Sequence, residues 1–267
     1  MERIKRLFRS RSLAFWLFIV FIVVPGLPFV GVTLASAIYT YWPLSLDEIE
    51  TPAMAEDVQH IVLLAHGLKD VSATWSDRVA RSFESGDPAT RVVSLDWNPY
   101  SASTLRCSVD GMRIGAALAE EWSSRADLSS VHLIGHSCGS FVVQGFCETL
   151  AEVRPEVRIQ ATFLDPVTVY GGFFWEYGVE RFGRCADFAE AYIDTGDTVP
   201  GSNIPLPHTH TFDVTSARPG DFGESPHVWP TAYYARLARE GAALDLRASA
   251  DVVDRYPRGE ASGPLVR

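Results

Sequence analysis

The sequence predicts an α/β fold, a mostly parallel sheet flanked by helices, preceded by an N-terminal membrane-spanning helix. Three observations predict this class. After residue 58, short apolar runs alternate with longer segments of helical period, the pattern of strands joined by crossover helices. The run at 131–135 is apolar apart from His132, as expected for a strand that is covered on both faces. The first forty residues contain a long uncharged stretch.

Composition allows one sizeable core, because the chain has 267 residues and 47% of them are hydrophobic. Residues 1–41 contain five basic residues and one acid, which leaves 18 basic against 32 acidic residues in the remainder. This excess of acidic residues makes the body poorly suited to bind nucleic acid or an anionic membrane surface through charge. No nucleic-acid partner is therefore expected.

The stretch 13–41 has no charged residue and exceeds the length of about 20 residues that spans a bilayer as a helix. Basic residues precede it, so the positive-inside rule keeps the N-terminus in the cytoplasm and exports the body. Two interpretations remain open. Tyr39, Tyr41 and Trp42 resemble an interfacial aromatic belt and favour an uncleaved anchor, whereas 35–37 (ASA) resembles a signal-peptide cleavage site that would release a secreted protein.

The predicted organisation is a basic segment with an anchor or signal peptide at 1–42, a polar linker at 43–58 and one catalytic domain at 59–267. The tail from about residue 245 is expected to be loose or to form a final short element. Strands are predicted at 60–65, 91–95, 131–135, 158–164, 188–193 and 210–214, and helices at 74–84, 104–126, 138–152 and 229–240.

Residues 135–139 (GHSCG) fit the G-x-S-x-G pattern of a nucleophilic serine. The strand before this pentapeptide and the helix after it supply the required context, in which the serine occupies a sharp strand-to-helix turn. The pattern predicts the α/β-hydrolase fold with Ser137 as nucleophile. Because a helix N-terminus favours negative charge, the N–H of Cys138 is expected to be one oxyanion donor.

A second oxyanion donor is expected after the early strand 61–65, which runs into His66-Gly67-Leu68. In hydrolases of this type, the loop after an early strand supplies the other N–H group, and a glycine lets that backbone approach the substrate. The N–H of Leu68 is the candidate, and an ordinary strand-ending turn is the alternative.

The order of the catalytic triad in this fold, serine, then acid, then histidine, excludes the histidines that precede Ser137. His227 lies in a loop before a predicted helix, where a general base above the sheet has to lie to reach the serine. His210 is the reserve candidate. Two acids compete, Asp165 at the end of one predicted strand and Asp197 after the next, and the residues alone slightly favour Asp197.

The sequence also resembles the pancreatic-lipase family, which includes lipoprotein lipase and related phospholipases A1. The similarity covers about 60–235 and consists of six ordered segments: 65–70 with Trp75 beyond, 95–97, 131–139, 163–166, 186–194, and His227 with Tyr233-Tyr234.

This resemblance implies a serine esterase or lipase and favours Asp165 as the acid, because the family carries it after the earlier of the two strands. No metal or other cofactor is implied. The chain differs from the family in two ways: the lid region 215–226 is short, and no C-terminal β-sandwich domain is expected after residue 240. The aromatic residues between 173 and 177 are expected to line an acyl pocket or contact lipid, or else to belong to the core.

The four cysteines lack metal-ligand spacing, so a zinc site is not expected. In an exported body one disulfide is possible, with Cys138 directed into the core and unpaired, and buried free thiols are the alternative.

The leading hypothesis for function is hydrolysis of a carboxyl ester or lipid by Ser137, His227 and an aspartate. Two other classes are kept open: an envelope acyltransferase that uses the same triad, and a catalytically inactive, membrane-tethered binding protein.

Overall fold

The computed structural model describes residues 12–265 apart from 51–53, 56, 85–86 and 250, and it divides into two compact units between Trp42 and Pro43. The first unit is a continuous helical segment formed by α2 (Leu13–Phe18), the π-helical η1 (Ile19–Val23) and α3 (Val24–Tyr41).

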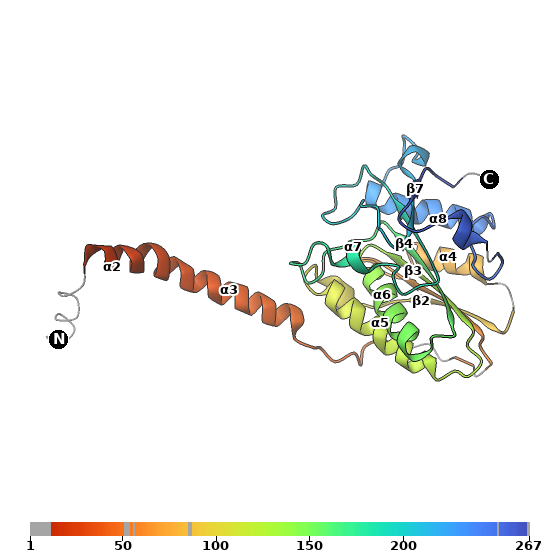
Figure 1. The fold of residues 1–267 in the computed structure, drawn as a ribbon, viewed down its shortest axis with the longest axis horizontal. Coiled ribbons are helices and arrows are strands. Elements are labelled where there is room, and N and C mark those ends of the chain that lie inside the picture. The colour runs from red at the N-terminus through yellow and green to blue at the C-terminus, as the bar shows by residue number, and fades with distance from the viewer. Residues whose placement is uncertain (1–11, 51–53, 56, 85–86, 250, 266–267) are drawn as a thin grey trace. The chain divides into compact units, whose positions relative to one another are not determined.

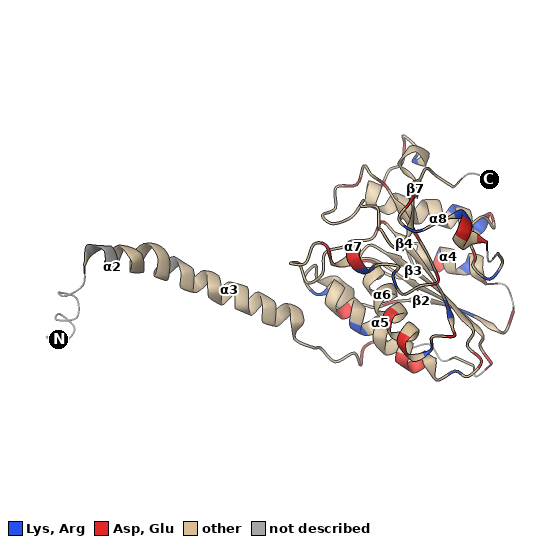
Figure 2. Ribbon diagram, in the orientation of Figure 1, with Lys and Arg blue, Asp and Glu red and all other residues tan. Residues whose placement is uncertain are grey.

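The segment Phe15–Tyr41 has a mean hydropathy of 2.5 and is long and apolar enough to cross a membrane as an anchor or to serve as a signal sequence. Figure 2 shows no charged residue along it, whereas charged residues are scattered over the second unit.

The second unit is built on one seven-stranded sheet in the order β2-β1-β3-β4-β5-β6-β7, in which every neighbouring pair is parallel (Figure 1). The chain leaves β1 toward β2 on one side and then returns to β3 on the other side of β1. Open α/β sheets bind ligands at the carboxyl ends of the strands where the strand order reverses, and here these are the ends of β1 and β3. The strands are β1 (His60–Ala65), β2 (Thr90–Leu95), β3 (Ser130–His136), β4 (Arg158–Leu164), β5 (Phe188–Ile193), β6 (His210–Asp213) and β7 (Ala261–Ser262).

Helices cover both faces of the sheet, as Figure 1 shows. Alternate residues of a strand point to opposite faces, so Leu63 packs in the cluster formed with α5 (Cys107–Ser123) and α6 (Gly139–Val153), and its neighbour Leu64 packs with α4 (Ser76–Phe83) and α8 (Trp229–Arg239). The double cover explains why the central strands β3, β4 and β5 are buried along almost their whole length.

The predicted fold class is confirmed, and the six predicted strands agree with the structure within one residue at each end. The four predicted helices are also present, with α5 shorter than expected at both ends. The short elements α7 (Tyr177–Arg181), α9 (Val252–Arg255) and β7 were not predicted individually, because fewer than six residues give no readable periodicity. The tail does contain a final short strand, β7.

The segment 43–58 has no helix or strand among its described residues, yet it packs on the body. Met54 and Val58 are buried in the core, and the Tyr100 hydroxyl donates a 2.6 Å hydrogen bond to the Ser45 carbonyl oxygen. The Arg113 guanidinium bonds the Leu44 carbonyl oxygen at 2.7 Å. The predicted linker is therefore part of the folded surface of the second unit.

The cysteines form two disulfides, Cys107–Cys138 and Cys147–Cys185. The prediction that Cys138 stays unpaired is wrong, and so is the alternative of free thiols. Residues 107 and 138 are distant in sequence, and only the packing of α5 against the start of α6 brings their Cα atoms to 6.0 Å.

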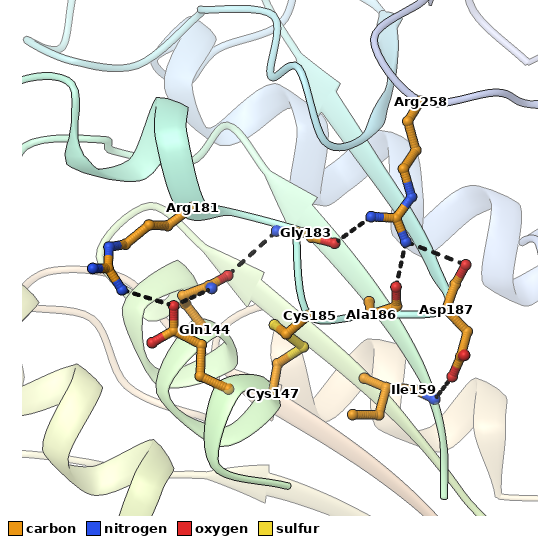
Figure 3. Close-up of a disulfide and its surroundings, with 10 residues drawn as sticks. Gln144, Cys147, Ile159, Arg181, Gly183, Cys185, Ala186, Asp187 and Arg258 are labelled. Carbon is orange, nitrogen blue, oxygen red and sulfur yellow. Dashed lines mark hydrogen bonds and ion pairs between the residues drawn. A yellow bond between two sulfur atoms is a disulfide. The ribbon is translucent and has the colours of Figure 1, made fainter. Parts of the chain in front are cut away.

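The second disulfide joins α6 to the loop that leads into β5 (Figure 3). Arg258, from the C-terminal segment, donates hydrogen bonds to the carbonyl oxygens of Gly183, Ala186 and Asp187 in the same loop. The loop is thus held to α6 by the disulfide and to the C-terminal segment by the hydrogen bonds of the Arg258 guanidinium.

Candidate active site

Ser137 occupies a tight turn between β3 and α6, with a backbone φ of 54° that side-chain-bearing residues rarely adopt. The turn requires glycine on both sides. A Cβ on Gly135 would lie 2.7 Å from the Gly139 carbonyl oxygen, and a Cβ on Gly139 would lie 2.2 Å from the Ala65 carbonyl oxygen. The pentapeptide therefore has the geometry of a nucleophile elbow, with the start of α6 pressed against the end of β1.

The loop after β1 runs directly beside Ser137, since a Cβ on Gly67 would lie 3.0 Å from the Ser137 Cβ. In the part of the chain that the structure describes, neither the Leu68 N–H nor the Cys138 N–H donates to a protein acceptor. Two unpaired amides beside a serine are the arrangement that can hold a developing oxyanion.

The loop that carries Leu68 is fixed by the buried side chain of His66. Its Nδ1 lies 3.0 Å from the Gly67 carbonyl oxygen, its Nε2 accepts from the Trp97 N–H at 3.3 Å, and the Trp97 indole donates to the His66 carbonyl oxygen at 2.9 Å. These bonds join the loop after β1 to the loop after β2. The direction of the Leu68 amide is thereby set by buried contacts.

His227 lies in the short 3-10 helix η4 (Pro226–Val228), directly before α8. The position of this turn is fixed by Trp229, which is buried and whose indole donates to the Val214 carbonyl oxygen at 2.9 Å. His227 lies against the elbow, because His136 Nε2 is 3.0 Å from the His227 carbonyl oxygen and the two ring centroids are 4.9 Å apart. Among the described residues the His227 ring bonds only through Nδ1, and the Ser137 hydroxyl makes no hydrogen bond.

Two carboxylates contact the same nitrogen of His227. Nδ1 is 3.1 Å from Asp165 Oδ2 and 2.9 Å from Asp197 Oδ2. The sequence offered these residues as competing candidates, but the fold brings both to the ring. Asp165 follows β4 and Asp197 follows β5, and neighbouring parallel strands end at the same edge of the sheet.

The two carboxylates have different surroundings. Asp197 Oδ1 accepts the N–H groups of Thr198 at 2.7 Å and Val199 at 3.2 Å, and Ser202 donates to Oδ2. Burial alone would raise the pKa of Asp197, but the bonds from Ser202 and those amides, with the charge of His227, outweigh it and hold the pKa below the usual value.

Asp165 is fully buried, and its Oδ1 has no hydrogen-bond partner among the described residues. Burial raises the pKa of Asp165 to about 6, against the opposing effect of the His227 ring. Asp197 is thus well solvated by protein groups, whereas Asp165 depends mainly on His227, with a weaker contribution from the Asn203 backbone.

Burial would lower the pKa of His227, but the two carboxylates outweigh it, Asp165 first, so the pKa is raised above its ordinary value. Burial and the adjacent His227 lower the pKa of His136 to about 3, so His136 stays neutral beside it. His227 can therefore accept a proton with two anions near it and no competing cation from the elbow.

Backbone strain is concentrated at this edge of the sheet. The non-glycine residues with positive φ in the described chain are Lys69, Ser137, Asp165 and Asn203, with φ of 55°, 54°, 42° and 56°. Lys69, Ser137 and Asp165 lie in loops that contain predicted site residues. Asn203 is connected to one of them, because its side chain donates to the Asp197 carbonyl oxygen at 2.6 Å. Strained conformations of this kind cluster at functional sites.

The other candidate histidine has structural partners. The reserve candidate, His210, is buried on β6, with Nδ1 3.1 Å from the Pro257 carbonyl oxygen and Nε2 2.9 Å from the Ser262 hydroxyl. Sequence reasoning missed His136 as a neighbour of His227 and Ser202 as a partner of Asp197. The only sequence feature that could have indicated the contact between Ser202 and Asp197 is the presence of a serine shortly after Asp197.

The group in the described chain that could hold a metal ion consists of Asp165, Asp197 and His227, whose ligand atoms lie within 4.8 Å of one another. The Nδ1 of His227 already bonds both carboxylates, and a triad histidine uses its Nδ1 in this way.

Comparison with known proteins gives distant structural likenesses. No protein-family model matches the chain, and no curated protein matches it in sequence. A protein from Xanthomonas campestris pv. campestris assigned to the α/β-hydrolase superfamily is 16% identical with a TM-score of 0.42, covering 68% of this chain and 99% of that one. A Trichoderma reesei cutinase, solved with a phosphonate inhibitor, is 18% identical with a TM-score of 0.33, covering 90% and 94%.

Because these likenesses are distant, the fold is assigned from the topology of the chain itself. The second unit is an α/β-hydrolase fold: a parallel sheet, helices on both faces and a serine at the strand-to-helix turn after β3.

Proposed function

We propose that this protein is a serine carboxyl-ester hydrolase with Ser137 as nucleophile and His227 as general base. The observation that carries the proposal is the strained turn at Ser137, which lies against the Gly67 loop and whose His136 contacts His227, a histidine that bonds carboxylates through Nδ1. Each part has a defined task in acyl transfer.

In this mechanism His227 Nε2 removes the Ser137 hydroxyl proton as Oγ attacks the ester carbonyl. The oxyanion is held by the N–H groups of Leu68 and Cys138, at the positive end of α6. The same imidazole then gives its proton to the leaving alkoxide, and the acyl group stays on Ser137 until water, activated by His227, releases the acid. The carboxylates on Nδ1 keep the tautomer that leaves Nε2 free to accept.

The proposal is tested by reacting the folded protein with a fluorophosphonate and mapping the modified residue by mass spectrometry. We expect covalent modification at Ser137, together with release of free acid from a p-nitrophenyl ester in plain buffer. Modification without release of free acid, together with formation of a new ester once an alcohol acceptor is added, would identify an acyltransferase. A folded protein that is neither modified nor active would identify an inactive scaffold and refute the proposal.

The finer assignment, a pancreatic-lipase-like enzyme acting on lipid esters, has one structural support. Phe173, Phe174 and Trp175 are about half exposed in the segment that follows Asp165. Three successive exposed aromatic side chains suit an apolar acyl chain or a lipid surface.

We further propose that the second unit acts on the exported side of a membrane, attached through the helix Phe15–Tyr41. The two disulfides support export, because disulfides persist in oxidising compartments and are rare in the cytosol. A signal peptide that is cleaved would export the same body as a secreted protein.

Disulfide status provides the measurement for export. Protein isolated without reductant should not react with a maleimide under denaturing conditions, and after reduction all four cysteines should react. Full reactivity before reduction would place the body in a reducing compartment.

A further inference from the structure

We infer that Asp165 and Asp197 act together as positioning residues for His227, so that either carboxylate alone suffices to hold the ring. This inference rests on the proposed function for its kinetic part only. It goes beyond a triad with a single acid, because it assigns two simultaneous acceptors to one imidazole nitrogen.

The geometry is the first argument. The Nδ1–H has one proton, and acceptors at 3.1 Å and 2.9 Å share it in a three-centre bond. The acceptors approach from the ends of two neighbouring strands, β4 and β5, so loss of one contact leaves the other in place. A rigid sheet edge, rather than a mobile loop, sets the starting point of both segments.

The different surroundings of the two carboxylates are the second argument. Asp197 receives two backbone N–H groups and the Ser202 hydroxyl, which support a negative charge even when His227 is neutral. Asp165 has weaker support, a single backbone contribution from Asn203, and its Oδ1 is buried without a hydrogen-bond partner among the described residues. Asp197 therefore stays ionised whether His227 is neutral or protonated. Asp165, in contrast, gains most of its electrostatic stabilisation when the His227 ring becomes positively charged.

The charged and titratable groups that face the His227 ring from the packed elements of the described chain are His136, Asp165 and Asp197. His136 is neutral in the working range, since burial holds its pKa far below the usual value. Removal of either carboxylate must therefore lower the pKa of His227, and removal of both must lower it further.

The test compares Asp165→Asn, Asp197→Asn and the double variant. Each single variant should lose less than about tenfold in kcat/KM because one carboxylate still sets the tautomer, whereas the double variant should lose about 10⁴-fold. The acid limb of the pH profile should move to lower pH in each single variant and further in the double one. Asp221→Asn, which removes an exposed charge in the loop before His227, should do neither.

An NMR titration of the His227 ring in the same variants measures its pKa without any catalysis. A stepwise fall in that pKa supports the inference even if the protein hydrolyses no ester, so failure of the proposed function remains distinguishable. Thermal unfolding identifies variants that have lost the fold. If one single variant behaves like the double variant and the other like wild type in both measurements, one acid alone serves His227 and the inference is wrong.

Discussion

Replacing Ser137 by alanine is expected to reduce kcat/KM for a short p-nitrophenyl ester by roughly 10⁴-fold or more, as removal of a catalytic serine does in other hydrolases. The variant keeps the two amides and His227 but has no oxygen to form the acyl-enzyme. Its fold should be unchanged, because the Ser137 hydroxyl makes no hydrogen bond with the described residues. Steady-state kinetics and fluorophosphonate modification measure the loss.

Ser140→Ala is the matched control for this prediction. Ser140 is the second residue of α6, is fully buried, and its hydroxyl has no hydrogen-bond partner among the described residues. Its removal should leave both activity and modification near wild-type values. If Ser137→Ala retained turnover and modification, another residue would be the nucleophile.

Replacing Gly139 by alanine is expected to damage both stability and activity. The new methyl group would lie 2.2 Å from the Ala65 carbonyl oxygen and 2.6 Å from that of His66, so α6 would have to move away from β1. Overpacking of this kind costs about 1–3 kcal/mol of unfolding free energy. The displacement would also separate the Cys138 amide from the Leu68 amide, and a shift of about 1 Å in a site can cost about 10² in rate.

The direction of the change in unfolding free energy separates close packing from helix propensity. Alanine is the better helix former and would by itself stabilise α6 by about 1 kcal/mol, so a loss of stability points to the close packing. Gly223→Ala is the control, since a Cβ there meets no atom within 4 Å and the residue lies in the loop before His227. Chemical denaturation and kinetics of the two variants measure the difference. A Gly139→Ala variant as stable and active as Gly223→Ala would show that the elbow does not depend on close contact with β1.

The two acids show where sequence reasoning reaches its limit. Asp165 and Asp197 each follow a predicted strand, and the patterns on both sides were correctly read. Sequence spacing treats them as alternatives because each position is judged separately. The register of β4 against β5 makes them neighbours, and this register follows from side-chain packing on two faces of the sheet.

The disulfides illustrate the same limit. Four cysteines allow three pairings, and their spacing does not select among them. Cys107 begins α5 and Cys138 precedes α6, and the close packing of these two helices decides the pairing. Similarly, the contact of His136 with the His227 carbonyl oxygen joins residues 91 positions apart, which local periodicity cannot reveal.

By itself, the sequence determined the fold class, the strands and long helices, the apolar N-terminal segment and the serine turn, because each depends on residues near one another in the chain. Hydrophobic period and glycine position are local properties. Tertiary structure alone decided the cysteine pairs, the convergence of Asp165 and Asp197 on one nitrogen, and the packing of the described part of 43–58 on the body. These features depend on which faces meet when the sheet and helices exclude water, and that is a property of the whole core.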